Sequence, residues 1–255
     1  MTGWHDLEYE LDLWAGAGTT ATFWWRDDDA VEDSPALRRL LDLHARFDVP
    51  LAIAAIPALA DGTLARALAE VPALAVFQHG YAHCNHTPDQ RAKSELGRDR
   101  PVPAVLADLS AGRARMDELF GALWHPILVP PWNRIDAAVV AALPDEGYRG
   151  ISAMGARGAT DAVPRLKRID VHVDLIDWPT TRGFAGDGVV LGAALAHLRR
   201  RRAGAAEPNE PTGLMTHHLA HDNACWAFIE SFLAATLGHP AARWIDAPAA
   251  FGLDR

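Results

Sequence analysis

Three histidines lie within eight residues of each other and could bring imidazole nitrogens to one metal ion. His79, His83 and His86 follow the apolar run 73–77, which predicts a short buried β-strand. The spacing of four between His79 and His83 brings two nitrogens together if the segment turns helically, and Gly80 permits an unusual backbone conformation there. One histidine would indicate an ordinary polar loop, but three at a strand end predict a metal site. Two imidazoles do not hold a divalent ion alone, so a third ligand must come from elsewhere.

Strands and helices alternate along the chain. Runs rich in apolar, β-branched or aromatic residues predict strands at 19–26, 51–56, 73–77, 127–129, 148–153, 165–174, 212–216 and 244–246. Stretches with helical spacing of apolar residues predict helices at 4–14, 34–47, 61–70, 103–121, 136–143, 189–202 and 222–237. This repeated alternation indicates a parallel sheet, which is either open or closed into a barrel.

The ends of the predicted strands carry the polar residues that decide between these two architectures. They are Asp27-Asp28-Asp29 after the first strand, the histidines after the third, Pro130 to Asn133 after the fourth, Asp174 and Asp177-Trp178 after the sixth, and His217 after the seventh. Polar residues at the carboxyl ends of many strands meet at one point only if the strands form a ring. An open sheet would gather its site at one switch point, usually with a Gly-rich phosphate turn, and the sequence has no such turn. We therefore expect an α/β fold closed as a (β/α) barrel.

Length and composition indicate one globular domain. The 255 residues suit a single barrel domain over residues 1–255, with residues 1–18 as a peripheral N-terminal helix. The formal net charge of −9 argues against a nucleic-acid partner, and no run of 18 apolar residues is present that could span a membrane. The acidic N-terminal residues do not resemble a signal peptide, so we expect a cytoplasmic protein.

The motifs, taken in order, resemble those of the polysaccharide deacetylase family, which is also called carbohydrate esterase family four. That family carries an acidic pair on its first strand, a His-x-x-x-His motif, an Arg/Pro-containing motif, an Asp-x-x-Asp-Trp-like motif and a late motif that ends in histidine. The corresponding segments here are Asp28-Asp29, His79 to His83, Val129 to Asn133, Asp174 to Trp178 and Leu214 to His217. The resemblance extends from about residue 19 to residue 220. It implies an irregular (β/α) barrel, often of about seven parallel strands.

The resemblance also implies a function and a metal site. It predicts a metal-dependent hydrolase that cleaves the C–N bond of an N-acetyl group or another amide, in a carbohydrate or a small amide substrate. Asp29, His79 and His83 would bind a divalent metal ion, for which this mixed ligand set favours zinc. Asp28 would be the catalytic base. Because three aspartates stand in a row, Asp27 and Asp28 remain the alternative pair for the base and the metal ligand.

The remaining motifs supply an acid and the walls of a substrate site. His217 corresponds to the general acid of the family, and it would protonate the leaving nitrogen. Asp174 would orient that imidazole or a nearby cation. The neighbouring His218 would point in a different direction and pack. The residues expected to contact substrate are Pro131, Trp132, Asn133 and Trp178, whose indoles could present apolar faces to a sugar or another flat substrate.

Two departures from the family pattern bear on activity. Val129 occupies the position where the family usually has an arginine that sets the charge environment of the base, so either Arg26 or Arg134 replaces it, or activity is altered. Trp132-Asn133 stands where an aromatic residue and glycine usually follow, which changes the wall of the groove. Two alternatives stay open, namely a barrel that keeps its metal but binds a ligand without turnover, which Val129 makes possible, and a non-metal α/β protein whose histidines are incidental. The expected substrate is a small intracellular amide, a sugar derivative or a cyclic ureide.

Overall fold

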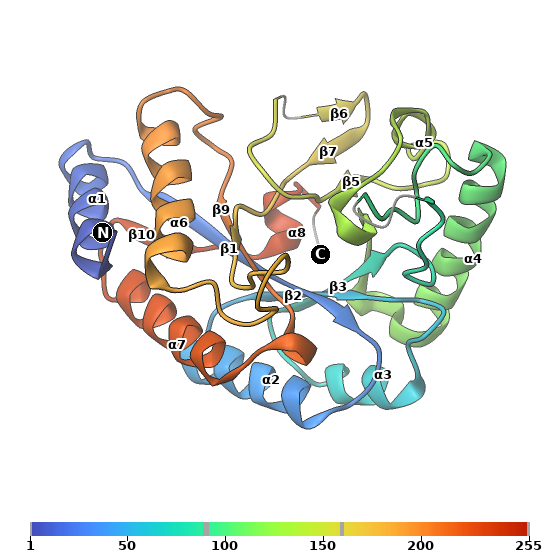
Figure 1. The fold of residues 1–255 in the computed structure, drawn as a ribbon, viewed down its shortest axis with the longest axis horizontal. Coiled ribbons are helices and arrows are strands. Elements are labelled where there is room, and N and C mark those ends of the chain that lie inside the picture. The colour runs from blue at the N-terminus through green and yellow to red at the C-terminus, as the bar shows by residue number, and fades with distance from the viewer. Residues whose placement is uncertain (1, 89–91, 159–160, 254–255) are drawn as a thin grey trace.

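A curled β-sheet surrounded by helices forms the centre of the computed structural model, which describes residues 2–88, 92–158 and 161–253 (Figure 1). Within these residues, the sheet has ten strands in the order β6-β7-β5-β4-β3-β2-β1-β9-β8, with β10 paired to β1. The strands are β1 (Ala21–Ala30), β2 (Leu51–Ala55), β3 (Leu74–His79), β4 (Trp124–Val129), β5 (Gly150–Ile151), β6 (Asp161–Val163), β7 (Leu166–Arg168), β8 (Val173–Asp174), β9 (Thr212–Thr216) and β10 (Ala242–Trp244). All of their pairings are parallel except that of β6 with β7. The expected barrel-like α/β class is confirmed, and the expected number of about seven strands is too low because several strands are only two or three residues long.

Helices lie around the outside of the sheet (Figure 1). They are α1 (Trp4–Gly16), α2 (Pro35–Phe47), α3 (Gly62–Leu68), α4 (Val102–Phe120), α5 (Ala137–Ala142), α6 (Asp187–Arg202) and α7 (Asn223–Leu237), and the short α8 (Ala247–Ala250) follows the last strand. Helix α2 begins where its sequence predicts, because the Ser34 hydroxyl accepts a hydrogen bond from the Leu37 amide and proline occupies the first helical position. The 3-10 turns are η1 (Gly121–Leu123), η2 (Pro131–Asn133) and η3 (His218–Ala220). None of the described helices is long and apolar enough to cross a membrane.

The interior of the curled sheet is filled by its own cluster of apolar side chains. Trp24 of β1 and Phe77 of β3 both face Phe251, with ring centroids 6.2 and 5.8 Å away and the rings nearly perpendicular. Phe251 comes directly after α8, an element that the sequence did not predict. The segment after β10 therefore packs into the inside of the barrel, and we infer that it supports the strands that carry the polar residues at their other ends.

The first strand continues beyond its predicted end. The sequence predicted that it would stop at Arg26, but β1 runs to Ala30 and includes all three aspartates. It does so because both neighbours supply backbone partners, β9 as far as the pair Asp27–Thr216 and β2 as far as the pair Ala30–Ala55. The last predicted strand, 244–246, is also displaced, since β10 covers Ala242–Trp244.

The continuous segment 166–174 contributes β7 and β8, which lie near opposite ends of the strand order of the sheet. Strand β7 pairs with β5, and the chain then extends this pairing through hydrogen bonds from Ile169 N to Ile151 O and from Val171 N to Ala153 O. Only one residue later, His172 N donates to Gly213 O and β8 begins to pair with β9. The predicted strand 165–174 is therefore split into two short strands, and it is the segment by which the sheet closes on itself.

A glycine-to-alanine pair tests this close approach. A Cβ on Gly213 would lie 2.7 Å from Val171 Cα and 2.8 Å from Asp170 O, so Gly213→Ala should lower the free energy of unfolding by about 1–3 kcal/mol. Gly192 lies in α6, where an added methyl group would meet nothing within 4 Å, so Gly192→Ala should raise it by about 0.5–1 kcal/mol. Urea unfolding monitored by tryptophan fluorescence measures both effects. Equal changes in the two variants would mean that the segment does not pack tightly against β9.

Candidate active site

A cavity of about 750 Å³ opens beside the carboxyl ends of β1, β3 and β9. Most residues expected from the sequence line this one cavity, namely Asp28, Asp29, His79, His83, Trp132, Asn133, Asp174, Trp178 and His217. Pro131 is the exception, because it is buried behind the wall with its ring close to Gly80. The Met154 and Met215 side chains also line the cavity and were not singled out from the sequence.

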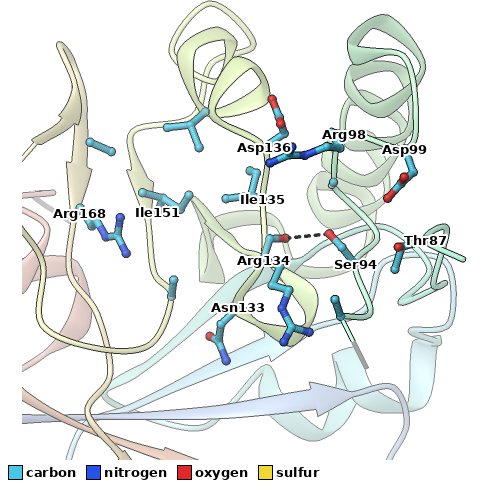
Figure 2. A pocket seen from close by; sticks show the side chains of 15 residues that line it. Thr87, Ser94, Arg98, Asp99, Asn133, Arg134, Ile135, Asp136, Ile151 and Arg168 are labelled. Atoms are coloured by element: carbon cyan, nitrogen blue, oxygen red, sulfur yellow. Dashed lines mark hydrogen bonds between the residues drawn. The ribbon is translucent and has the colours of Figure 1, made fainter. Parts of the chain in front are cut away.

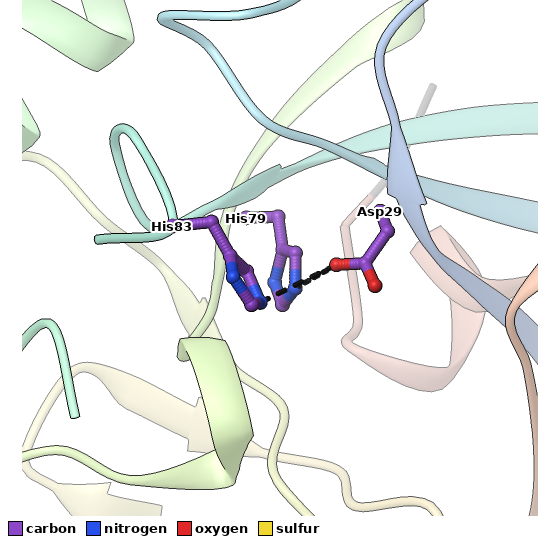
Figure 3. A group of neighbouring side chains, drawn as sticks. All are labelled: Asp29, His79 and His83. Carbon is purple, nitrogen blue, oxygen red and sulfur yellow. Dashed lines mark ion pairs between the residues drawn. The ribbon is translucent and has the colours of Figure 1, made fainter. Parts of the chain in front are cut away.

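Asp29, His79 and His83 bring three ligand atoms together within 4.8 Å of one another (Figure 3). The Asp29 Oδ1 atom lies 3.1 Å from His79 Nε2 and 3.4 Å from His83 Nε2. His79 Nδ1 lies 3.0 Å from the Val129 carbonyl oxygen, to which it can only donate, so a neutral His79 presents an unprotonated Nε2 to this group. The donor set and its orientation fit a divalent metal ion. The two histidines reach this position without the helical turn expected from their spacing, since residues 80–88 are irregular.

Burial and neighbouring charged groups both shift the pKa values of these three residues. Burial alone would raise the pKa of Asp29, but the hydrogen bond and charge of His79 outweigh it and hold that pKa well below its usual range. Burial would lower the pKa of His79, but Asp29 and the nearby Asp28 raise it instead. For His83, burial and the neighbouring His79 lower the pKa. The pKa shifts of Asp29 and His83 thus favour the unprotonated forms that bind a metal ion, whereas the raised pKa of His79 means that a cation would compete with a proton for its Nε2.

The backbone around the cavity adopts uncommon conformations. Asp29 has a φ of 72°, His83 and Trp132 have a φ of 54°, and Asn133 has a φ of 55°. Non-glycine residues in this left-handed region are uncommon, and such strain gathers at functional sites. At Asp29 the consequence is direct. A regular strand turns successive side chains to opposite faces, but the conformation of Asp29 and the register shift between Asp27 and Ala30 let both Asp28 and Asp29 line the same cavity.

Asp28 is held by a buried arginine from its own strand. Arg26 Nε donates to Asp28 Oδ1 and Arg26 Nη2 donates to Asp28 Oδ2, each at 2.8 Å, and the Arg26 side chain is fully buried. The same guanidinium donates to the Ser152 hydroxyl at 2.6 Å. Of the two arginines considered for the position left open by Val129, Arg26 therefore makes the contact, whereas Arg134 donates to the Lys93 carbonyl oxygen.

Asp27 points away from the cavity. Its Oδ2 accepts hydrogen bonds from the Thr216 hydroxyl at 2.6 Å and from the His218 amide at 3.1 Å, and its Oδ1 forms an ion pair with His218 Nδ1. Burial would raise the pKa of Asp27, but His218 outweighs it and lowers that pKa. Asp27 and His218 form a fully buried pair behind β1, so the geometry favours Asp28 and Asp29, not Asp27 and Asp28, as the pair that serves the cavity.

His217 and Asp174 lie on the opposite wall without a hydrogen bond to each other among the described contacts. Asp174 Oδ2 accepts a hydrogen bond from Trp178 Nε1 at 2.9 Å, and its Oδ1 accepts one from the Ile176 amide. The Trp178 ring meets the His217 ring edge to face, with centroids 4.8 Å apart. Asp174 is therefore connected to His217 through Trp178, which contacts both residues. Burial raises the pKa of Asp174, against the lowering effect of His217.

Glu95 is a site residue that no sequence motif indicated. Its carboxylate is almost completely buried and accepts hydrogen bonds from the Tyr81 amide at 3.1 Å and the Ala82 amide at 2.7 Å. Gly80 precedes these amides with a φ of 56°, and any Cβ there would collide with Glu95 and Pro131. Glu95 thus fixes the turn that places His83. Its only signal in the sequence is the long polar connection 87–100, which does not single out one carboxylate.

A second group of possible metal ligands lies near the amino end of β9. His172 Nε2 and His197 Nε2 stand 3.7 and 3.6 Å from the buried Glu210 carboxylate. Here, however, His172 Nδ1 accepts a hydrogen bond from the Gly213 amide, so a neutral His172 carries its proton on Nε2 and has no lone pair there. Arg157 Nε, 3.7 Å from Glu210, already supplies a positive charge. At His79 the Nδ1 atom donates a hydrogen bond, whereas at His172 it accepts one, so the second cluster suits a structural ion-pair cluster.

Comparisons with known proteins agree with this architecture. No protein-family model matches the sequence, and no curated protein matches it. A solved structure from Mycobacterium smegmatis, named as a polysaccharide deacetylase, is 17% identical with a TM-score of 0.63, over 92% of this chain and 90% of that one. A family 4 carbohydrate esterase from Streptomyces lividans is 14% identical with a TM-score of 0.56, over 88% and 90% of the two chains. A family 4 pseudoenzyme from Bacillus anthracis is 12% identical with a TM-score of 0.54, over 88% of this chain and 63% of that one. The chain therefore has the fold of the polysaccharide deacetylases and family 4 carbohydrate esterases.

The role of Glu95 can be tested by an isosteric change. Glu95→Gln keeps the size of the side chain but replaces one acceptor with a donor that faces a backbone amide, so the turn carrying His83 should loosen. We expect zinc affinity to fall by about 10–100-fold, as for other residues that support metal ligands. Competition with a chromophoric chelator measures the affinity. Glu118→Gln, at an exposed residue on α4, is the matched control, and unchanged affinity in both variants would contradict this role.

Proposed function

We propose that this protein is a metal-dependent hydrolase that cleaves the C–N bond of an N-acetyl group or another amide, in a carbohydrate or a small amide substrate. One observation carries the proposal. A carboxylate held by an arginine, a group of three metal-ligand side chains and a histidine from β9 all line one cavity. The names of the similar structures, a polysaccharide deacetylase and a carbohydrate esterase, support the same reaction class.

Asp29, His79 and His83 would hold the metal ion. A carboxylate with two imidazole nitrogens suits zinc and leaves coordination positions open, although a similar esterase from Clostridium thermocellum is described with cobalt. When bound, such an ion would polarise the carbonyl of the scissile amide and acidify a water molecule. Glu95 and the Val129 carbonyl oxygen would keep the two imidazoles in place.

Asp28 would accept the proton of the attacking water. Both of its oxygens accept a hydrogen bond from Arg26, and each oxygen retains a lone pair that can face the cavity. The arginine fixes the orientation of the carboxylate, so that little reorganisation is needed when the proton arrives. In this chain the arginine comes from β1, two residues before the base, and not from the segment that contains Val129.

His217 would deliver a proton to the leaving nitrogen. Its side chain lines the cavity, and its buried Nδ1 has no hydrogen-bond partner among the described residues. Trp178 packs against the imidazole ring and is itself fixed by Asp174. Across the cavity, Trp132 lies against His83 with ring centroids 4.2 Å apart, and Asn133 lies beside it. The two indoles would bind the flat faces of the substrate, and Pro131 would support Trp132 from behind.

The second candidate is a barrel that retains its metal and binds a ligand without turnover. One of the similar structures is a pseudoenzyme, and the carboxylate of Asp174 is bonded to Trp178 and not to the proposed acid. The two candidates predict the same metal content and differ in whether an amide is cleaved. The proposal also includes a cytoplasmic location, which is consistent with a small amide or a sugar derivative as the substrate.

The base and the metal group are tested together. Zinc-loaded wild-type protein should release acetate or amine from a panel of N-acetylated sugars and small amides, and chelation should abolish the release. Asp28→Asn should keep one zinc per chain and lower kcat by about a hundredfold or more, because a positioned base typically raises the reaction rate about 10²–10⁴-fold. His79→Ala, as the comparison variant, should lose the zinc. Elemental analysis and an acetate assay provide the two readouts.

Three outcomes would change the assignment. Zinc binding with no cleavage of any compound would favour the ligand-binding candidate. Absence of zinc from the wild-type protein after incubation with the metal would refute the hydrolase. Loss of zinc in Asp28→Asn would make Asp28 a ligand and leave Asp27 as the base, in spite of its contact with His218.

The acid is tested by comparing leaving groups. An amine departs poorly unless it is protonated, whereas a nitrophenolate departs largely unaided. His217→Ala should therefore reduce amide cleavage by about a hundredfold or more and reduce cleavage of nitrophenyl acetate far less, with unchanged zinc content. His239→Ala, at a residue that pairs with Asp12 on α1, is the control and should affect neither substrate. Equal losses on both substrates in His217→Ala would show that His217 supports binding or structure and does not donate a proton.

A further inference from the structure

Three cationic side chains surround the same cavity. Lys93, Arg134 and Arg182 line it together with the metal-ligand group. The guanidinium of Arg182 lies over the Trp178 ring, with its carbon 5.6 Å from the ring centroid, and Arg134 Nη1 donates to the Lys93 carbonyl oxygen at 3.0 Å. These contacts place positive charge on both sides of the cavity, next to the two proposed indole walls.

The three cations have no carboxylate partner within 4 Å in the part of the chain that the structure describes. Other described arginines, such as Arg39 and Arg66, also lack a carboxylate partner within 4 Å, so the distinguishing feature of these three cations is that they line one cavity. Uncompensated charge at the mouth of a concave site concentrates field lines and draws in ligands of opposite sign.

The acidic side chains inside the cavity do not need these cations. Asp28 is paired with Arg26 through two hydrogen bonds. Asp29 faces the two imidazoles of the proposed metal group, where a divalent ion would add further positive charge. Asp174 is bonded to Trp178 and the Ile176 amide. Lys93, Arg134 and Arg182 therefore form no ion pair with any of these three carboxylates.

Arg134 has a position that connects the catalytic cavity to a neighbouring one. The second cavity, of about 590 Å³, shares Asn133 and Arg134 with the first. Figure 2 shows the Arg134 side chain beside that of Asn133, and Asn133 Oδ1 is in turn 3.4 Å from Arg26 Nη2. Only the Asn133 side chain would thus separate a group bound by Arg134 from Arg26, the arginine that holds the base.

We propose that the substrate carries an oxyanion, a carboxylate or a phosphate, close to the amide that is cleaved, and that Arg134 and Arg182 bind it with help from Lys93. This inference rests on the proposed function and narrows it from an N-acylated sugar or small amide to an anionic one. The planar guanidinium of arginine matches the oxygens of both groups, which a neutral hydroxyl-rich sugar does not require. Arg134 and Arg182 are specificity residues and not catalytic ones.

The experiment measures binding of amino sugars, so that it does not depend on turnover. Calorimetric titration of the zinc-loaded protein should show that glucosamine 6-phosphate or muramic acid binds at least about tenfold more tightly than glucosamine, as expected for one or more charged hydrogen bonds. Which of the two binds more tightly distinguishes a phosphate from a carboxylate. The preference should disappear in the double variant Arg134→Gln/Arg182→Gln and persist in Arg243→Gln, an exposed residue of β10 far from the cavity. It should also weaken when sodium chloride is raised from about 50 to 500 mM.

Two results would overturn the inference. One is binding of both anionic compounds that is undetectable or no tighter than that of glucosamine. The other is a preference that survives the double variant, because the anion would then be bound at the zinc ion. Cleavage of the matching N-acetylated compounds is measured separately. Anion preference without cleavage would support the anion-binding site and contradict the hydrolase function. Cleavage without anion preference would support the hydrolase function and contradict the anion-binding site.

Discussion

The geometry of the cavity depends on the departure of β1 from regular strand alternation at Asp29. Two adjacent carboxylates on a regular strand face opposite sides, and only one of them could then serve the cavity. The left-handed backbone at Asp29, with the register shift beside it, turns the second carboxylate to the side of the first. One of these acids can then hold a cation while its neighbour remains available for a proton. His83 and Trp132, which also have a left-handed backbone, line the same cavity close to Asp29.

The strand that carries these acids balances its charges on both faces. Toward the cavity, Arg26 forms an ion pair with Asp28. Behind the strand, Asp27 forms an ion pair with His218 and accepts a hydrogen bond from Thr216. All four charged or titratable groups are buried, so each would be costly if it stood alone. Because the two pairs lie on opposite sides of one backbone, the position of each acid also constrains its neighbour. The run of three aspartates is thereby resolved into one structural residue and two that face the cavity.

The sequence predicted the parts of the fold that depend on local pattern. The apolar runs and the helix with its cap at Ser34 are found close to the expected positions, and polar residues at strand ends correctly indicated a curled sheet whose strands converge. The extent of β1 could not be predicted, because its pairing with β9 joins residues almost two hundred positions apart. The roles of Arg26 and Val129 illustrate the same limit. The sequence left two arginines as candidates, and only the position of each side chain relative to Asp28 distinguishes them.

Glu95 shows why part of the site left no sequence signal. Its function depends on two backbone amides, those of Tyr81 and Ala82, and backbone groups have no residue type that a motif could record. The second histidine and glutamate cluster shows the opposite problem, since His172, His197 and Glu210 have the composition of a metal site. The direction of a single hydrogen bond, from the Gly213 amide to His172, makes that cluster unlike the group at His79.

The pairing of β1 with β9 and β10 has a consequence for how the chain folds. The first strand emerges before its partners: one edge pairs with residues 212–216, and the beginning of the other edge pairs with residues 242–244. Until these are made, one edge of β1 has unsatisfied backbone groups and is open to pairing with other chains. Contacts of such high sequence separation also slow folding, because a long loop must close before they form. His217, at the end of β9, therefore joins the cavity only when the sheet closes, so a chain interrupted before β9 would hold Asp29, His79 and His83 without the histidine that faces them.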